Sequence, residues 1–423
     1  MSEAKKEYEM LKGLLNGKQV GTLDSEILLS CVQQQTLSQL GNSPMYYVLH
    51  DGCDIRKPDS KALEYLGQVM SLSKQVINGY KTMNSVVVDI DNQGVSLLCH
   101  ELYSNKMPTY IGQTTLHDPK ALSELNAAQQ QMILEKTYVN TLVLFKKNLK
   151  KSSELLKSTN PKSQVGHIFD REFDDESVFE YIDQDLKDSF VARLKSSRSS
   201  HQTFHPSTPA GKISKREVHY KLIDKTYANN SIYKIESILI KGTKHENVEA
   251  HIDWEIVSIN QKSYTSVRIT LLKDGKPIFP QPMLLLTNQK VNSAEAAKSV
   301  YMAYLLRSKI EVVFKFLKQN LGWEAFQIRD FNSIKNLLAL AFFLVGFFPE
   351  LEKELKSHPL AIQLCKLARA KGKITLHFLL KGLEMLTNFQ QVSVWMKQND
   401  IEKEDIDDFL ADLGIINNVI LKT

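Results

Sequence analysis

The stretch 304–318, whose sequence is YLLRSKIEVVFKFLK, contains five polar side chains at spacings of three or four residues or multiples of a helical turn. Placed on an α-helix at about 100° per residue, they form one polar stripe: Tyr304, Arg307, Glu311, Lys315 and Lys318. Ile310, Phe314 and Leu317 fall on an apolar stripe, which predicts a buried face. One acid therefore stands in a row of cations, which can position a phosphate. The simpler interpretation is a surface helix with an Arg307–Glu311 ion pair that contributes roughly a few tenths of a kcal/mol.

Basic residues also cluster outside this stretch. The segment 193–221 contains seven Lys or Arg residues and one acid, Glu217. Shorter basic runs lie at 146–151 and 366–373. Lys and Arg segments gain affinity for nucleic acid by releasing counterions, so these segments are candidates for phosphate contact. A solvated linker is the alternative for the first segment, and a helix C-terminus that favours cations is the alternative for the first of the shorter runs.

Two short apolar runs are each followed by acidic residues. YYVLHD (46–51) and SQVGHIFD (163–170) are typical of strands that end in aspartate. Each acid has a structural alternative, because an aspartate before glycine suits a turn and acids suit the first turn of a helix. The aspartates of these two regions are Asp51, Asp54, Asp170, Asp174 and Asp175.

The spacing on the helix resembles a known signature. Y-x2-R-x3-E-x6-K, formed by Tyr304, Arg307, Glu311 and Lys318, is similar to that of the transposases of bacterial insertion sequences, the cut-and-paste DDE enzymes of the group that carries number four. In that group the signature helix follows a strand region, and here PMLLLTN (282–288) precedes it.

The resemblance implies a catalytic site of three carboxylates. Such enzymes resemble ribonuclease H and hold two Mg²⁺ ions, for which Mn²⁺ can substitute, on two aspartates and one glutamate. YYVLHDGCDI resembles the first block, and we select Asp51, with Asp54 as a turn or supporting residue. VGHIFDREFDD resembles the second block, D-R-x-F/A-D, and we select Asp170, with Asp174 and Asp175 as alternatives. Glu311 is the third ligand, and the three acids follow in the family's order.

The same resemblance implies the reaction and the partners. Water and then a 3′-hydroxyl would attack phosphodiesters in line, first at the transposon ends and later in target DNA. One metal site can serve every step because only the nucleophile changes. The partner is double-stranded DNA, bound by a homodimer on paired ends. The predicted DNA-binding residues are Tyr304, Arg307, Lys318, Lys315 and Arg171.

The remaining pattern predicts the elements that position these residues. Residues 24–39 are helical, 85–103 form a hairpin around Asn-Gln-Gly, 120–150 form one long helix, and 292 onward is nearly all helix. Asn292 and Glu295 suggest a capping box for the signature helix. The implied fold class is α/β, a ribonuclease-H-like core with a β-rich insertion and helical terminal parts.

The implied domain boundaries follow these elements. We expect an N-terminal helical region at 1–44 for DNA-end binding and the first part of the core at 45–205. The β-rich insertion is expected at 206–288 and the rest of the core at 289–345. A C-terminal helical region for DNA contact or dimerisation is expected at 346–423.

Composition excludes several classes of protein. The chain has 423 residues, 43% hydrophobic and 24% charged, with a net charge of +5, which is ordinary for a globular protein. Its four cysteines form no C-x-x-C pair, so we expect reduced cytosolic thiols. The longest apolar run, 337–348, is shorter than the roughly 20 residues that span a bilayer. With no secretion signal in the N-terminal stretch, the expected location is cytoplasmic, in a bacterium and near the nucleoid.

Two other functions stay open. A stand-alone ribonuclease-H-like nuclease is one, because about 45 residues before the first strand is short for a separate DNA-binding domain. A catalytically dead or domesticated DNA-binding protein is the other, although acids at all three positions argue against it.

Overall fold

One mixed sheet dominates the computed structural model of this chain. The structure describes residues 13–15, 23–88, 95–204, 216–240, 243–355, 358–369 and 376–398. The chain divides into two units, Met1–Gly346 and Phe347–Thr423, and the sheet belongs to the first.

Five strands surround the candidate aspartates Asp51 and Asp170. They are β1 (Met45–Arg56), β3 (Val76–Val88), β4 (Val95–Tyr103), β5 (Gln164–Phe169) and β6 (Ser189–Arg193). β3 pairs antiparallel with β1 and with β4, whereas β5 pairs parallel with β1 and with β6. This arrangement is compatible with a ribonuclease-H-like core. The β3–β4 pairing confirms the predicted hairpin, although its turn at 89–94 lies outside the described residues.

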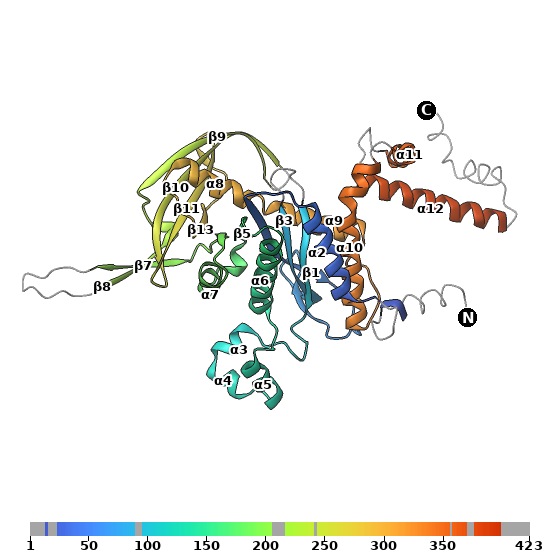
Figure 1. The fold of residues 1–423 in the computed structure, drawn as a ribbon, viewed down its shortest axis with the longest axis horizontal. Coiled ribbons are helices and arrows are strands. Elements are labelled where there is room, and N and C mark those ends of the chain that lie inside the picture. Colours follow the sequence, from blue (N-terminus) through green and yellow to red (C-terminus); the bar gives the residue numbers. More distant parts are fainter. Residues whose placement is uncertain are drawn as a thin grey trace, which may run out of the picture. The chain divides into compact units, whose positions relative to one another are not determined.

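The later strands extend the same sheet. From β6 it continues through β13 (Met283–Thr287), β11 (Lys262–Lys273), β10 (Thr243–Ile259) and β9 (Asn229–Ile240), with β12 (Lys276–Pro277) on β11 and β2 (Gly67–Met70) on β3. The β-rich character expected for 206–288 is confirmed in the described part of that range. Its long strands β9 to β11 are therefore continuous with the core, while β7 (Ser199–Phe204) and β8 (Arg216–Lys221) form a separate two-stranded ribbon (Figure 1).

Alternation along the strands separates two buried faces. Leu49 of β1 and Ile168 of β5 pack in one core with α8 (Ala294–Leu305), α9 (Ser308–Asn320) and α10 (Phe331–Leu355). On the other face, Val48 and Phe169 pack toward α6 (Thr141–Thr159), which lies across β1, β3, β4 and β5 (Figure 1). The same alternation therefore decides toward which face of the sheet Asp51 on β1 and Asp170 after β5 point their side chains.

Several helix ends differ from the sequence-based prediction. The range 120–150 is not one helix but α4 (Pro119–Ser123), α5 (Ala127–Glu135) and the start of α6, preceded by α3 (Gln113–His117). Asn126 opens α5 with a capping box, and Lys136 ends it in the left-handed conformation. The predicted cap at Asn292 is also wrong, because the side chain of Ser293 accepts the hydrogen bond from the Ala296 N–H. The helix predicted at 24–39 is confirmed as α2 (Ser25–Gln39).

Short helices connect the remaining elements of the first unit. The 3₁₀ helices η1 (Arg171–Phe173) and η3 (Leu222–Asp224) follow β5 and β8. After Asp175 the chain forms α7 (Glu176–Glu180), which continues as the π-helix η2 (Tyr181–Leu186). Among these short helices, η1 begins directly after Asp170.

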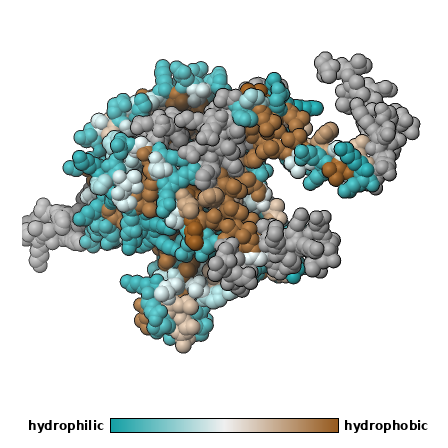
Figure 2. Space-filling model, turned by 45° about the vertical axis from the view of Figure 1, so that its right-hand side comes forward, coloured by the Kyte–Doolittle hydropathy of each residue, from teal (hydrophilic) through white to brown (hydrophobic). Residues whose placement is uncertain are grey.

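In the second unit two helices pack against each other. α11 (Pro359–Leu367) and α12 (Leu376–Gln398) pack through Ala361, Leu364, Cys365 and Leu379. On the face in Figure 2, hydrophobic side chains gather near the centre and hydrophilic ones lie around them. Among the described helices, none is long and apolar enough to cross a membrane.

Candidate catalytic carboxylate site

The side chain of Arg307 brings three carboxylates together. Its Nη1 lies 2.7 Å from Asp51 Oδ2, and its Nη2 lies 2.6 Å from Glu311 Oε1. The same Nη2 lies 3.6 Å from Asp170 Oδ2. The acids that resemblance selected at three distant positions therefore converge on one cation. This geometry places three acids around one guanidinium.

Asp51 lies in the middle of a strand, not at its end as the sequence suggested. β1 runs from Met45 to Arg56, and its parallel pairing with β5 stops at His50. Beyond that point β1 continues against β3, with Asp51 opposite Asn84. Asp51 thus stands where one neighbouring strand ends, and its carboxylate contacts Arg307 at the start of α9. Strand alternation directs Asp54 to the opposite face.

Asp170 follows β5 directly and begins the turn η1. Its Oδ1 accepts a hydrogen bond from the Arg171 N–H at 2.8 Å. The hydroxyl of Tyr304 donates to the same oxygen at 3.3 Å, and Arg193 Nη1 lies 3.7 Å from it. Because β5 and β6 are parallel and Phe169 pairs with Ala192, Arg193 at the end of β6 falls next to Asp170.

A break in the signature helix positions Arg307 and Glu311. The predicted continuous helix is divided into α8, which ends at Leu305, and α9, which begins at Ser308 with Arg307 as its N-terminal flanking residue. The apolar stripe is confirmed, because Ile310, Phe314 and Leu317 are buried. Glu311 lies in the first turn of α9, and its side chain is 57% exposed.

Charges and burial compete at this site. Burial raises the pKa of Asp51 to about 7; Arg307 opposes that rise, while Asp170, Glu172 and Glu311 add to it by repulsion. Burial lowers the pKa of Arg307, but Asp51 and the other neighbouring acidic groups raise it more, so the guanidinium stays charged. Burial also raises the pKa of Tyr304 to about 12, and Asp170 contributes to the rise. Tyr304 is therefore a hydrogen-bond donor at neutral pH.

The remaining predicted DNA-binding residues differ in their environments. Lys315 on α9 and Arg171 in η1 are exposed. Lys318 is half-buried, and its ammonium donates to the carbonyl oxygen of Asp54 at 2.6 Å and to Glu324 Oε1 at 3.0 Å. Lys318 therefore joins α9 to β1, and its predicted phosphate contact stays a prediction.

Sequence reasoning did not assign two residues to the site. Glu172 follows Asp170 by two positions; burial and the carboxylates of Asp54 and Asp170 raise its pKa, which Lys81 opposes. Arg193 was counted only as part of the basic segment. The parallel pairing of β5 and β6 is the signal that would have placed Arg193, because adjacent parallel strands end at the same sheet edge.

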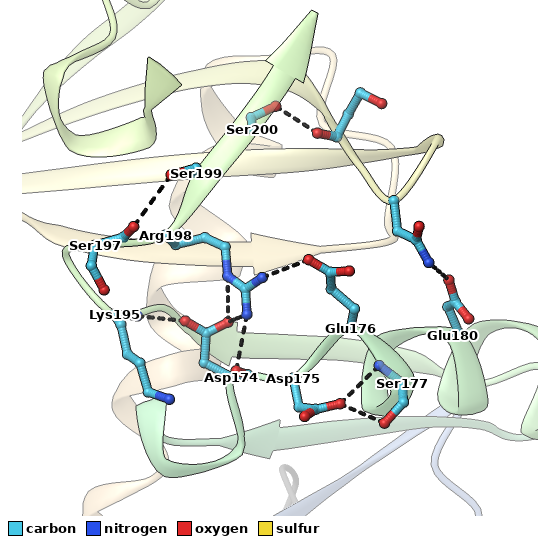
Figure 3. Close-up of polar contacts among 12 residues, drawn as sticks. Asp174, Asp175, Glu176, Ser177, Glu180, Lys195, Ser197, Arg198, Ser199 and Ser200 are labelled. Atoms are coloured by element: carbon cyan, nitrogen blue, oxygen red, sulfur yellow. Dashed lines mark hydrogen bonds and ion pairs between the residues drawn. The ribbon is translucent and has the colours of Figure 1, made fainter. Parts of the chain in front are cut away.

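The aspartates considered as alternatives belong to a different cluster. The carboxylate of Asp174 is buried against Arg198, 2.6 Å from its Nη2. Asp175 caps α7 by accepting a hydrogen bond from the Ser177 N–H at 2.9 Å. Figure 3 shows both side chains engaged in this cluster. The geometry therefore favours Asp170 as the member that faces Arg307.

A cavity adjoins the carboxylates. It has a volume of about 670 Å³ and includes Glu311, Arg171 and Arg193 in its lining. Apolar residues, among them Pro280 and Met283, form other parts of its wall. Two cations beside the carboxylates create a surface that can take an anionic chain next to the site.

The donor set suits hard divalent cations. Mg²⁺ is held by one or two carboxylates together with substrate phosphates. Within the described ranges, no three Asp, Glu, His or Cys side chains already stand in an arrangement that could hold a metal ion. Arg307 lies between the acids that would do so. Carboxylate oxygens are ligands that Mg²⁺ accepts, so the three side chains fit such an ion chemically. In this structure the guanidinium of Arg307 supplies the positive charge that lies between them.

A buried polar chain lies beneath the site. His167 Nδ1 is 2.9 Å from His50 Nε2, and His167 Nε2 is 3.2 Å from Asp188 Oδ2. Lys157 completes the chain at 2.6 Å from Asp188 Oδ1. Both nitrogens of the buried His167 ring therefore have polar partners within the protein.

A model of a known protein family matches part of this chain. Residues 153–346 match the family model of the transposase DDE domain. The matched part contains Asp170, Glu311 and Arg307, and it begins after Asp51. No curated protein gave a match to the chain. Over residues 153–346 the chain is therefore similar to the transposase DDE domain.

Proposed function

We propose that this chain is a DNA transposase of the insertion-sequence group with the Y-x2-R-x3-E-x6-K signature. It cleaves DNA at transposon ends and joins the freed 3′-hydroxyls to target DNA. The observation that carries the proposal is the convergence of Asp51, Asp170 and Glu311 on Arg307, at 2.7, 3.6 and 2.6 Å. The transposase DDE match over 153–346 supports the same class.

In the proposed mechanism Asp51, Asp170 and Glu311 would hold two Mg²⁺ ions. When bound, such ions activate an attacking oxygen and stabilise a leaving one in an in-line displacement at phosphorus. Arg307 turns from the carboxylates toward the scissile phosphate, whose charge it offsets. Tyr304 keeps Asp170 oriented through its hydroxyl.

DNA is held by residues around this centre. Arg171 and Lys315 are exposed and contact phosphates, and the cavity beside Glu311 admits the strand. Lys318 supports the site from α9 and contributes to phosphate binding. We propose that two copies act on paired ends; the exposed apolar side chains of α12, such as Phe389 at 72%, support a protein contact there.

Metal-dependent nicking of supercoiled plasmid tests the catalytic assignment. The wild type is expected to nick with Mg²⁺ or Mn²⁺, and Glu311→Gln is expected to lose nicking while still binding DNA in a gel-shift assay. Asp54→Asn is the matched control, because it changes a neighbouring acid of β1 that faces away from Arg307. Retained nicking by Glu311→Gln would contradict the assignment.

A second assay separates a transposase from a nuclease. Duplex oligonucleotides with randomised ends and free 3′-hydroxyls are incubated with plasmid, and joined products are sequenced. A transposase is expected to enrich one end sequence among the joined products. A stand-alone nuclease would cut the plasmid without joining any oligonucleotide.

A further inference from the structure

The turn that carries Asp170 is fixed at both of its ends. Asp170 opens η1, and Asp174 closes it with an N–H bond to the Arg171 carbonyl oxygen at 3.4 Å. Between them, the buried ring of Phe173 stacks on Phe145 at 3.9 Å between centroids. The position of Asp170 therefore depends on how firmly Asp174 is held.

Asp174 is held by the segment that follows β6. Its Oδ2 accepts a hydrogen bond from the Lys195 N–H at 2.8 Å, and its Oδ1 accepts one from Arg198 Nε at 2.9 Å. Arg198 Nη2 also donates to the Asp174 carbonyl oxygen at 2.9 Å. The Asp174 carboxylate is 0% exposed and the Arg198 side chain 15%, so the pair is largely shielded from water (Figure 3).

Arg198 uses every nitrogen of its guanidinium in this contact. The third nitrogen, Nη1, donates to Glu176 Oε1 at 2.9 Å. A planar fork of this kind fixes direction as well as distance, which a lysine ammonium cannot do. Figure 3 shows Arg198 lying between Asp174 and Glu176.

The backbone of Arg198 is fixed from the other side. Its N–H donates to the Lys195 carbonyl oxygen at 3.0 Å, and its carbonyl oxygen accepts from the Leu222 N–H at 3.0 Å. The β7–β8 ribbon begins at the next residue, Ser199. Arg198 thus connects the base of this ribbon to the Asp170 turn, while Arg193 contacts Asp170 itself.

We propose that Arg198 is a positioning residue that, through Asp174, holds the Asp170 turn in the geometry needed to bind metal. The proposal rests on the proposed function, because it assumes that Asp170 is a ligand. Residues that orient a ligand from outside the metal site commonly change metal affinity by about 10- to 100-fold when mutated.

The test is Mn²⁺ titration of the full chain by isothermal titration calorimetry. Arg198→Lys is expected to weaken Mn²⁺ binding by about tenfold, and hydrogen exchange is expected to accelerate at the amides of 171–174. Arg268→Lys is the matched control, because Arg268 makes a comparable fork to Asp253 at 2.9 and 3.0 Å on distant strands. It should leave Mn²⁺ affinity unchanged even if both variants lose similar thermal stability.

The outcomes separate this proposal from the proposed function. Mn²⁺ binding that is lost in Glu311→Gln but equal in Arg198→Lys and Arg268→Lys overturns the positioning role alone. Binding that Glu311→Gln does not affect overturns the metal site, and the positioning role with it. If Arg198→Lys does not fold, Glu176→Gln decides, because it removes one contact from an exposed partner and should weaken Mn²⁺ binding to a smaller extent. Unchanged affinity in that folded variant overturns the proposal.

Discussion

The guanidinium of Arg307 lies 2.7 Å from Asp51 Oδ2, which joins residues 256 positions apart in the sequence. The ion pair connects the start of α9 to the middle of β1, and Glu311 and Asp170 complete its surroundings. A cation at this place offsets the repulsion of the three acids in the metal-free chain. The same position makes Arg307 a competitor of any metal ion that the acids bind.

Removal of Arg307 is expected to destabilise the metal-free chain and to increase the stabilisation that metal gives. Arg307→Ala should lower the free energy of unfolding in EDTA by about 3 kcal/mol, because it leaves partly buried acids without their counter-charge. Added Mn²⁺ should then raise the melting temperature more in the variant than in the wild type, since a ligand of the folded state stabilises it. Thermal unfolding with and without Mn²⁺ measures both effects, and Lys315→Ala on the same helix is the control. An equal Mn²⁺ response in Arg307→Ala and the wild type would argue against a shared cation position.

Lys315 is expected to contribute one phosphate contact. It is exposed on α9 and follows Glu311 by one turn. Lys315→Met should weaken DNA binding at low salt and reduce the slope of log affinity against log salt by about one charge. Fluorescence anisotropy at several salt concentrations gives the slope. An unchanged slope would remove Lys315 from the DNA-binding surface.

Lys318 is expected to matter first for stability. Lys318→Met leaves the Asp54 carbonyl oxygen and Glu324 without the ammonium that lies 2.6 and 3.0 Å away. Loss of these contacts should cost about 2 kcal/mol in urea unfolding. The salt slope of the same variant tests the predicted phosphate contact: a reduction equal to that of Lys315→Met would support it, and a stable, fully DNA-binding variant would contradict both roles.

Acid is expected to destabilise the fold through His100. Burial, with a smaller contribution from Lys335, lowers the pKa of this histidine to about 3. Its ring stacks on Phe342, and its Nδ1 lies 2.8 Å from Asn84 Oδ1. The unfolded chain binds the proton below about pH 6.5 while the folded chain does not. Stability contributed by the neutral ring is therefore present above about pH 6.5 and lost as the pH falls toward about 3.

His100→Gln isolates this effect. The amide side chain keeps a hydrogen-bonding group and does not titrate. Between about pH 7.5 and about pH 5, the wild type should lose about 2 kcal/mol more unfolding free energy than the variant. Urea unfolding at the two pH values measures the difference. Equal losses would show that His100 does not set the acid sensitivity.

Local sequence patterns predicted most of the strands of the core. The apolar run ending at Asp170 is β5, and the two β-branched runs around 85–103 are β3 and β4. The length of β1 was not predictable in this way. It continues past Asp51 because β3 pairs with it as far as Arg56, a partner that no local pattern of β1 reveals.

Helix boundaries divide into two cases. The division of 120–150 had local signals, since Asn126 with Gln129 forms a capping box and Asn140 caps α6. The break between α8 and α9 lacks a glycine or proline in LLRS. It coincides with Arg307 at the junction, whose side chain is bound to Asp51.

The sequence by itself determined the chemical types and their order: two aspartates after apolar runs and one glutamate among cations, at Asp51, Asp170 and Glu311. The spacing on α9 also determined which residues share a helix face, because 3.6-residue periodicity is a local property. The tertiary structure decided which acids contact Arg307 and which cation forms an ion pair with each acid. Those choices depend on strand pairing and helix placement between distant segments, such as the β5–β6 pairing that brings Arg193 to Asp170. Such contacts form only when the whole sheet is assembled, so no local pattern encodes them.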